Sequence, residues 1–136
     1  MLKKLMLILL ISLSILNADF KEVNEIELQK MIKNGVLVID IRRDEEHKAL
    51  GLINSSTALT FFKKDGSYNV PEWMNEFVKL VKTKDQSFVL VCAHANRTKV
   101  VGNFLSKQMK YKNVYDLKGG IVHGWIDKGL KTVKFK

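Results

Sequence analysis

The sequence predicts a single α/β domain built on a parallel β-sheet with helices on both faces. Short apolar runs that suit buried strands recur along the chain and alternate with segments of helical apolar spacing. These runs are nearly continuous in apolar residues, which is typical of parallel strands covered on both faces. The chain of 136 residues, 46% hydrophobic and 27% charged, is long enough for one core and has an ordinary globular composition.

The first eighteen residues are typical of an export signal. Lys3 and Lys4 precede an apolar run over residues 5–16, which Asn17-Ala18 ends. A basic start, an apolar centre shorter than a membrane span and a small final residue define a secretory signal peptide. We therefore expect residues 1–18 to be cleaved, residues 19–136 to form the domain, and the protein to be exported to the periplasm. The alternative is an uncleaved signal that anchors the protein in the membrane.

The charge and the cysteine count narrow the class of protein. The net charge of +9 falls to +7 without residues 1–18, which contain two lysines and no acidic residue. The lysines are scattered and not interleaved with aromatic residues, so we expect no nucleic-acid partner and only a modest attraction for small anions. Cys92 is the only cysteine, which excludes an internal disulfide.

The first elements follow the signal. Asn24 and Glu27 form a capping-box pattern that begins a short amphipathic helix, and Asn34-Gly35 ends it. The run V-L-V-I-D-I over residues 36–41 then predicts a buried strand. The next segments predict, in order, one or two helical turns over residues 43–50, a turn over 51–54 and a strand over 57–61.

The second half repeats the alternation. A turn-rich loop over residues 63–69 precedes Pro71, which suits the first turn of a helix. The predicted buried face of that helix comprises Trp73, Met74, Phe77, Val78 and Val81. Further along, we expect a strand over residues 88–91, a helix from Thr98 to Met109, a strand over 113–117 and a last helix over 121–127.

Cys92 stands where a nucleophile is expected. It ends the apolar strand, and four residues with no apolar side chain larger than alanine separate it from Arg97. A tight loop between a strand and a helix directs backbone N–H groups and the positive end of the helix dipole toward the loop. These groups and Arg97 should favour the thiolate. The alternative is a buried thiol without a chemical role.

Other polar residues share this edge of the sheet. Asp40 and Arg42 end one predicted strand, Cys92 ends another, and residues 118–120 follow a third. In open parallel sheets the ligand binds at the carboxyl ends of the strands. The predicted sheet therefore places the ligand site at the carboxyl ends of its strands, where the cysteine loop also lies.

These features resemble a known family. The chain is similar to single-domain rhodaneses, the thiosulfate sulfurtransferase family, over roughly residues 26–130. The resemblance is carried by V-I-D-I-R, E-E-H followed by G-L-I, the loop from Cys92 to Arg97 followed by Thr98, and L-K-G-G-I-V-H-G-W. It implies a three-layer α/β fold with a central parallel sheet of about five strands. It also implies a ping-pong reaction in which Cys92 takes a sulfane sulfur as a persulfide and passes it to a nucleophilic acceptor.

The candidate site residues receive separate roles. The candidate catalytic residues are Cys92, as the nucleophile, and Arg97. We expect Arg97 to support the loop through an ion pair with an acid such as Glu46, and the alternative is direct contact with the substrate. We expect Asp40 and Arg42 to fix the strand end near the loop. The loop residues that would supply backbone N–H groups or line the site are Ala93, His94, Ala95, Asn96 and Thr98. His94 either offers a proton or charge at the pocket mouth or has no role.

The loop also departs from the family pattern. Ala95 replaces a glycine, and Ala93 stands where many members carry arginine. His47 occupies a position that is usually aromatic. The related dual-specificity phosphatases and arsenate reductases have one more residue between cysteine and arginine, so the shorter loop here favours sulfur over phosphate.

The sequence therefore predicts a sulfurtransferase without a cofactor. Its partners would be a small sulfur-containing anion as donor, thiosulfate or polysulfide, and a thiophilic acceptor. A homodimer and a periplasmic protein partner are open possibilities. Cys92, His94 and His123 lack a metal-binding spacing, so no metal site is predicted. The alternatives are a non-catalytic rhodanese-fold binding module and a thiol-redox protein, which would need a partner thiol.

Overall fold

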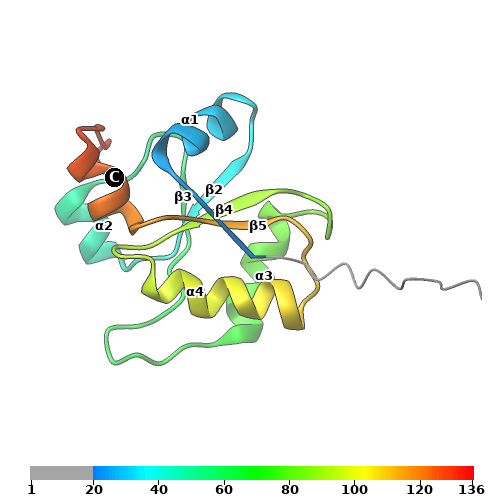
Figure 1. Cartoon of the computed structure of the whole chain (residues 1–136). Helices are drawn as coiled ribbons and strands as arrows, with labels where there is room; N and C mark the ends of the chain where they lie inside the picture. The colour runs from blue at the N-terminus through cyan, green and yellow to red at the C-terminus, as the bar shows by residue number, and fades with distance from the viewer. Residues whose placement is uncertain (1–19) are drawn as a thin grey trace, which may run out of the picture.

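A computed structural model describes residues 20–136 as three layers, a sheet between two layers of helices (Figure 1). The strands are β1 (Lys21–Val23), β2 (Leu37–Asp40), β3 (Thr57–Ala58), β4 (Phe88–Val91) and β5 (Val114–Leu117). The helices are α1 (Glu25–Lys33), α2 (Asp44–Leu50), α3 (Val70–Leu80), α4 (Asn96–Asn103), the π-helix η1 (Phe104–Gln108), α5 (Gly120–Gly124) and the 3₁₀ helix η2 (Ile126–Lys128).

The predicted signal peptide, residues 1–18, lies outside the described residues. Among the helices of residues 20–136, none is long and apolar enough to span a membrane.

The sheet has five parallel strands in the order β1-β5-β4-β2-β3, which confirms the predicted fold class. Strand β4 is central, and its four residues are all buried. In register, Ile39 of β2 lies beside Leu90 of β4, and Leu90 lies beside Asp116 of β5. Every pair of neighbouring strands is parallel, so all five strands end at one edge of the sheet.

Two of the strands differ from the sequence prediction. Strand β1 was not predicted, because only Val23 of its three residues is buried and an edge strand carries no apolar run. Strand β3 is shorter than predicted, since regular pairing stops at Ala58. The hydrogen bonds from the Leu59 and Phe61 N–H groups to Asp40 and Ile41 continue the contact with β2 in irregular form.

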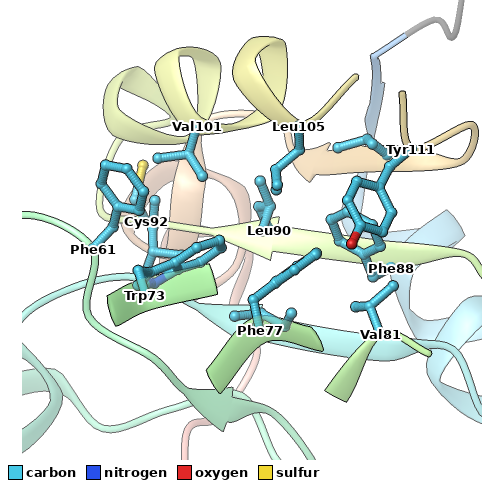
Figure 2. Close-up of a cluster of buried hydrophobic side chains, with 13 residues drawn as sticks. Phe61, Trp73, Phe77, Val81, Phe88, Leu90, Cys92, Val101, Leu105 and Tyr111 are labelled. Atoms are coloured by element: carbon cyan, nitrogen blue, oxygen red, sulfur yellow. The ribbon is translucent and has the colours of Figure 1, made fainter. Parts of the chain in front are cut away.

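Two apolar clusters pack on opposite faces of the sheet. The larger cluster lies under α3 and α4, and Figure 2 shows Phe77, Leu90, Val101 and Leu105 within it. The smaller cluster lies under α1 and α5 and includes Leu28, Val89, Ile121 and Trp125. Burial of these side chains is the dominant favourable term in folding.

Helix signals explain where the helices begin. The predicted capping box of α1 is present, with the Glu27 N–H donating to the Asn24 side chain at 2.9 Å. Asn69 caps α3, with Pro71 in its first turn. One member of the predicted buried face of α3 is wrong, because the Val78 side chain is 47% exposed at the rim of the face that Trp73 and Phe77 bury.

Candidate active site

Cys92 lies at the carboxyl end of the central strand. Its side chain is 1% exposed and belongs to the larger apolar cluster. Figure 2 shows it at the end of that cluster nearest Phe61. The thiol is therefore held in an apolar setting, with the loop over residues 93–95 leading from it to α4.

The carbonyl groups at the start of this loop are bound by α5. The Ile121 N–H donates to the Cys92 carbonyl at 2.8 Å, and the Val122 N–H donates to the Ala93 carbonyl at 3.1 Å. In contrast, the backbone N–H groups of residues 93–97 have no acceptor within residues 20–136. A series of unpaired N–H groups that ends in a helix N-terminus forms a place for an anion.

Two glycines allow α5 to approach the loop this closely. Gly119 and Gly120 have φ angles of 77° and 68°, which favour glycine. A side chain on Gly120 would place its Cβ 2.2 Å from the Ala93 carbonyl oxygen. The two glycines of the L-K-G-G motif thus allow α5, which is distant in sequence, to pack against the cysteine loop.

Ala95 adopts the conformation that a glycine would suit. Its φ is 65° and its ψ is 14°, in the left-handed region, immediately before α4. This is the position at which the sequence departs from the family's loop glycine. The substitution keeps the loop conformation at a cost of about 1 kcal/mol.

Arg97 is bound by Glu46, as predicted. Its Nη1 and Nη2 atoms donate to the two carboxylate oxygens, both at 2.7 Å. Glu46 also accepts from the Arg43 N–H at 2.9 Å at the start of α2. Burial acts to raise the pKa of Glu46, but the hydrogen bonds from Arg97 and Arg43 outweigh it and lower the pKa to about 2. The pair therefore ties the first turn of α4 to α2.

Asp40 and Arg42, which we expected to fix the strand end, form an ion pair with each other. Both side chains are buried, and Arg42 Nη2 donates to Asp40 Oδ2 at 2.8 Å and to the Gly51 carbonyl at 2.7 Å. His47 completes the group, with Nε2 3.1 Å from Asp40 Oδ1. Burial acts to raise the pKa of Asp40, but the bonds from His47 and Arg42 lower it overall. The buried ring of His47 packs at a tilt of 51° against Phe135, with the ring centroids 5.1 Å apart, so it takes the packing role of an aromatic residue.

Thr98 links Cys92 to a residue that the sequence analysis missed. The Thr98 hydroxyl lies 3.5 Å from Cys92 Sγ and donates to Asp116 Oδ2 at 2.8 Å. Asp116 lies in β5 and also accepts from Lys99 Nζ at 2.7 Å. Its position could have been noticed, because an acid inside the strand N-V-Y-D-L of a sheet covered on both faces must be buried.

The two loop-side histidines meet at the surface. The rings of His94 and His123 are 5.1 Å apart, and His123 Nδ1 lies 2.8 Å from Asp127. His94 is exposed, which leaves both of its predicted alternatives open. Within residues 20–136, no three His, Cys, Asp or Glu side chains are placed to hold a metal ion.

A basic groove adjoins the loop. It has a volume of about 420 Å³, and its lining contains four cations and no acid. The lining residues are Arg43, Phe62, Lys63, Lys64, Gly66, Asn96, Arg97 and Val100. Phe62 and Val100 also line a neighbouring, larger groove of about 520 Å³ with Phe61 on its wall.

The fold and site define a class of protein, an α/β domain with a single cysteine in an N–H-lined loop at the carboxyl edge of its sheet. Residues 25–127 match the rhodanese-like domain family, and the chain belongs to that family. No curated protein matches the chain.

Solved structures are similar over most of the chain. One is a rhodanese-related protein from Thermoplasma volcanium, with 25% identity, a TM-score of 0.63 and coverage of 84% of this chain and 98% of that one. Another is the polysulfide-sulfur transferase homodimer from Wolinella succinogenes, with 19% identity, a TM-score of 0.65 and coverage of 89% and 83%. A third, from Rhodopseudomonas palustris, is a protein of unknown function described as a possible tyrosine phosphatase, with 22% identity, a TM-score of 0.61 and coverage of 87% and 88%.

Proposed function

We propose that this protein is a sulfurtransferase in which Cys92 carries a sulfane sulfur as a persulfide. The observation that carries the proposal is the position of the only cysteine. It begins a loop in which the N–H groups of residues 93–97 lack acceptors within residues 20–136. Membership of the rhodanese-like family supports the same reading.

The reaction has two steps. The Cys92 thiolate attacks the outer sulfur of the donor and forms a new S–S bond, while the donor's own S–S bond breaks. The electron pair of the broken bond leaves with the rest of the donor, as sulfite from thiosulfate or as a shortened polysulfide. A nucleophilic acceptor then attacks the outer sulfur of the persulfide, and Cys92 leaves as a thiolate.

The loop suits the charge that this reaction places on sulfur. The outer sulfur of a persulfide is anionic, and unpaired backbone N–H groups stabilise an anion without moving. Arg97 is already engaged with Glu46, so its role is to hold the loop. The site thus consists of the Cys92 nucleophile, the backbone N–H donors and the Arg97–Glu46 pair that supports the loop.

The donor we propose is a small sulfur-containing anion, and polysulfide is favoured over thiosulfate. The basic groove beside Arg97 attracts anions through Arg43, Lys63 and Lys64. Ala93 offers no charge where many family members carry arginine, which removes one contact for the sulfonate end of thiosulfate. The similar Wolinella succinogenes protein is named a polysulfide-sulfur transferase.

The shorter loop favours sulfur transfer over phosphate hydrolysis. Four residues separate Cys92 from Arg97, and the Arg97 guanidinium is occupied by both oxygens of Glu46. A phosphatase needs that guanidinium for the phosphate oxygens. We therefore prefer sulfur transfer, although one similar structure is described as a possible tyrosine phosphatase.

We further propose that the protein acts in the periplasm, on the grounds of the signal-peptide pattern in residues 1–18. The similar Wolinella succinogenes protein is a homodimer, which supports a dimer of this chain as well. The acceptor this proposal requires is a thiophilic nucleophile, and a periplasmic protein is one partner of that kind.

Substitution of Cys92 by serine tests the nucleophile. We expect Cys92→Ser to abolish transfer of sulfur from thiosulfate or polysulfide to cyanide, because a hydroxyl does not form the persulfide. The melting temperature should change little, since the two side chains differ by one atom. Retained turnover would refute the assignment of Cys92, and the absence of turnover in the unaltered protein would favour a binding module.

A further inference from the structure

A chain of polar groups runs from Cys92 to the surface behind the loop. Thr98 Oγ1 lies 3.5 Å from Cys92 Sγ and 2.8 Å from Asp116 Oδ2. Lys99 Nζ lies 2.7 Å from Asp116 Oδ2 and 2.7 Å from Glu22 Oε1. Cys92, Thr98 and Asp116 are buried, whereas Lys99 and Glu22 reach the solvent.

The Thr98 hydroxyl has only one proton to give. Here it donates that proton to Asp116, so only its oxygen lone pairs are left for Cys92. Those lone pairs accept from a thiol S–H and repel a thiolate. While Asp116 Oδ2 holds the hydroxyl proton of Thr98, none is left for a thiolate, and a proton placed on Asp116 Oδ2 frees Thr98 to donate to the sulfur.

Asp116 is suited to hold that proton. Its Oδ1 atom has no hydrogen-bond partner within residues 20–136, although it is buried. Burial raises the pKa of Asp116, and the bonds from Lys99 and Thr98 oppose this without cancelling it.

The charges that face this group come from two elements. Glu22 of β1 lies beside Asp116 in register, and Lys99 of α4 lies between the two carboxylates. Lys118 acts electrostatically on the neighbouring Glu22. From β4, the register neighbour of Asp116 is the apolar Leu90. Cys92 itself also faces Arg97, whose charge is matched by Glu46.

We propose that Cys92, Thr98 and Asp116 share one proton, and that Asp116 is a positioning residue acting on the thiol through Thr98. In the first state Cys92 is a thiol and Asp116 a carboxylate. In the second, the S–H proton has moved to Thr98 and the Thr98 proton to Asp116, which leaves a thiolate and a carboxylic acid. No proton is lost to solvent between the two states.

This inference rests on the proposed function, because sulfur transfer is what gives the shared proton a role. While Cys92 carries sulfur as a persulfide, the proton would stay on Asp116. It would return to the sulfur when the acceptor releases Cys92 as a thiolate. The buried thiol would thus lose and regain its proton without contact with bulk water.

The test is the pH dependence of alkylation of the single thiol by iodoacetamide, followed by intact mass in the unaltered protein and in variants. Asp116→Asn removes the neighbouring anion, so the midpoint of the rate–pH curve should fall by about one pH unit. Lys99→Met removes the neighbouring cation, so the midpoint should rise. A role in folding alone does not produce shifts of opposite sign.

Matched controls lie at the opposite end of the sheet. Asp85 and Lys112 form an exposed ion pair with an N···O distance of 3.2 Å, before β4 and β5. Asp85→Asn and Lys112→Met remove the same charges there, and we expect both to leave the midpoint unchanged. An unchanged or raised midpoint in Asp116→Asn would overturn the proposal.

A second background tests the link through Thr98. The Asp116→Asn shift should persist with Thr98→Ser, which keeps the hydroxyl, and should fall to less than half with Thr98→Val. A full shift in the valine background would show an effect through space and would overturn proton sharing. Because alkylation needs no sulfur donor, this result is independent of whether Cys92 forms a persulfide.

Discussion

Two arginine–carboxylate pairs lie at the same edge of the sheet and do different work. Asp40 and Arg42 are two residues apart, with side chains 1% and 0% exposed. Glu46 and Arg97 are 51 residues apart, with side chains 22% and 23% exposed. The buried Asp40–Arg42 pair fixes the end of one strand, whereas the partly exposed Glu46–Arg97 pair joins α2 to the cysteine loop. The difference in burial therefore leads us to expect that the Asp40–Arg42 pair matters most for stability and the Glu46–Arg97 pair most for the geometry of the loop.

Breaking the buried pair should have the larger effect on stability. We expect Arg42→Met to lower the free energy of unfolding by about 3–5 kcal/mol, because Asp40 would stay buried without its cation. Chemical denaturation measures this loss. The double variant Asp40→Asn with Arg42→Met should lose less than the single one, and an equal or larger loss would contradict the assignment of the cost to an unpaired charge.

Breaking the partly exposed Glu46–Arg97 pair should affect activity more than stability. We expect Glu46→Gln to cost about 1 kcal/mol of stability, since a partly exposed pair contributes little. Sulfur transfer should fall about tenfold, because Arg97 would no longer hold the loop in place. Glu45→Gln is the matched control, since Glu45 is exposed and, within residues 20–136, its ion pair is with Arg43 alone. Equal turnover in both variants would remove the role of Glu46 in the loop.

The two pairs share a pH dependence that Asp116 opposes. The pKa of Glu46 is lowered to about 2 and that of Asp40 is lowered, so both stabilise the fold above pH 4.5. This stabilisation should be lost as the pH falls toward 2. The pKa of Asp116 is raised, so its contribution has the opposite sign. Denaturation between pH 5 and pH 2 should show a smaller loss of stability in Glu46→Gln than in the unaltered protein; an equal loss would contradict the lowered pKa.

Glycine substitutions in the cysteine loop should have the smallest effect on stability. Ala95 is left-handed, so Ala95→Gly should relieve strain and stabilise the protein by up to about 1 kcal/mol. Ala93 has no positive φ, so Ala93→Gly should instead destabilise it by about 0.5–1 kcal/mol. Thermal denaturation of the two variants separates them by sign, and a shift in the same direction would contradict the loop geometry.

Most of the fold could be predicted from local patterns. The apolar runs placed β2, β4 and β5. The capping box at Asn24 and the first-turn proline Pro71 placed two helices. Strand β1 was missed because its pairing with β5 depends on backbone hydrogen bonds at an edge, which leave no apolar signature. Val78 was misplaced because periodicity gives the direction of a helix face but not its width.

The site was predictable where one residue's chemistry implied another's. A guanidinium next to the loop requires an acid, which led to Glu46. Asp116 could not be assigned a partner from the sequence, because only the β4–β5 pairing and the start of α4 bring it to Thr98. The sequence predicted that the loop's backbone N–H groups would face the site. It could not predict that the Ile121 and Val122 N–H groups bind the Cys92 and Ala93 carbonyls.

The most direct test of the persulfide is the intact mass of the protein after brief exposure to polysulfide, and separately to thiosulfate. We predict a gain of one sulfur atom that cyanide removes, with polysulfide as the better donor and no gain in Cys92→Ser. No gain with either donor, in protein whose thiol is shown to be free, would contradict sulfur transfer by Cys92.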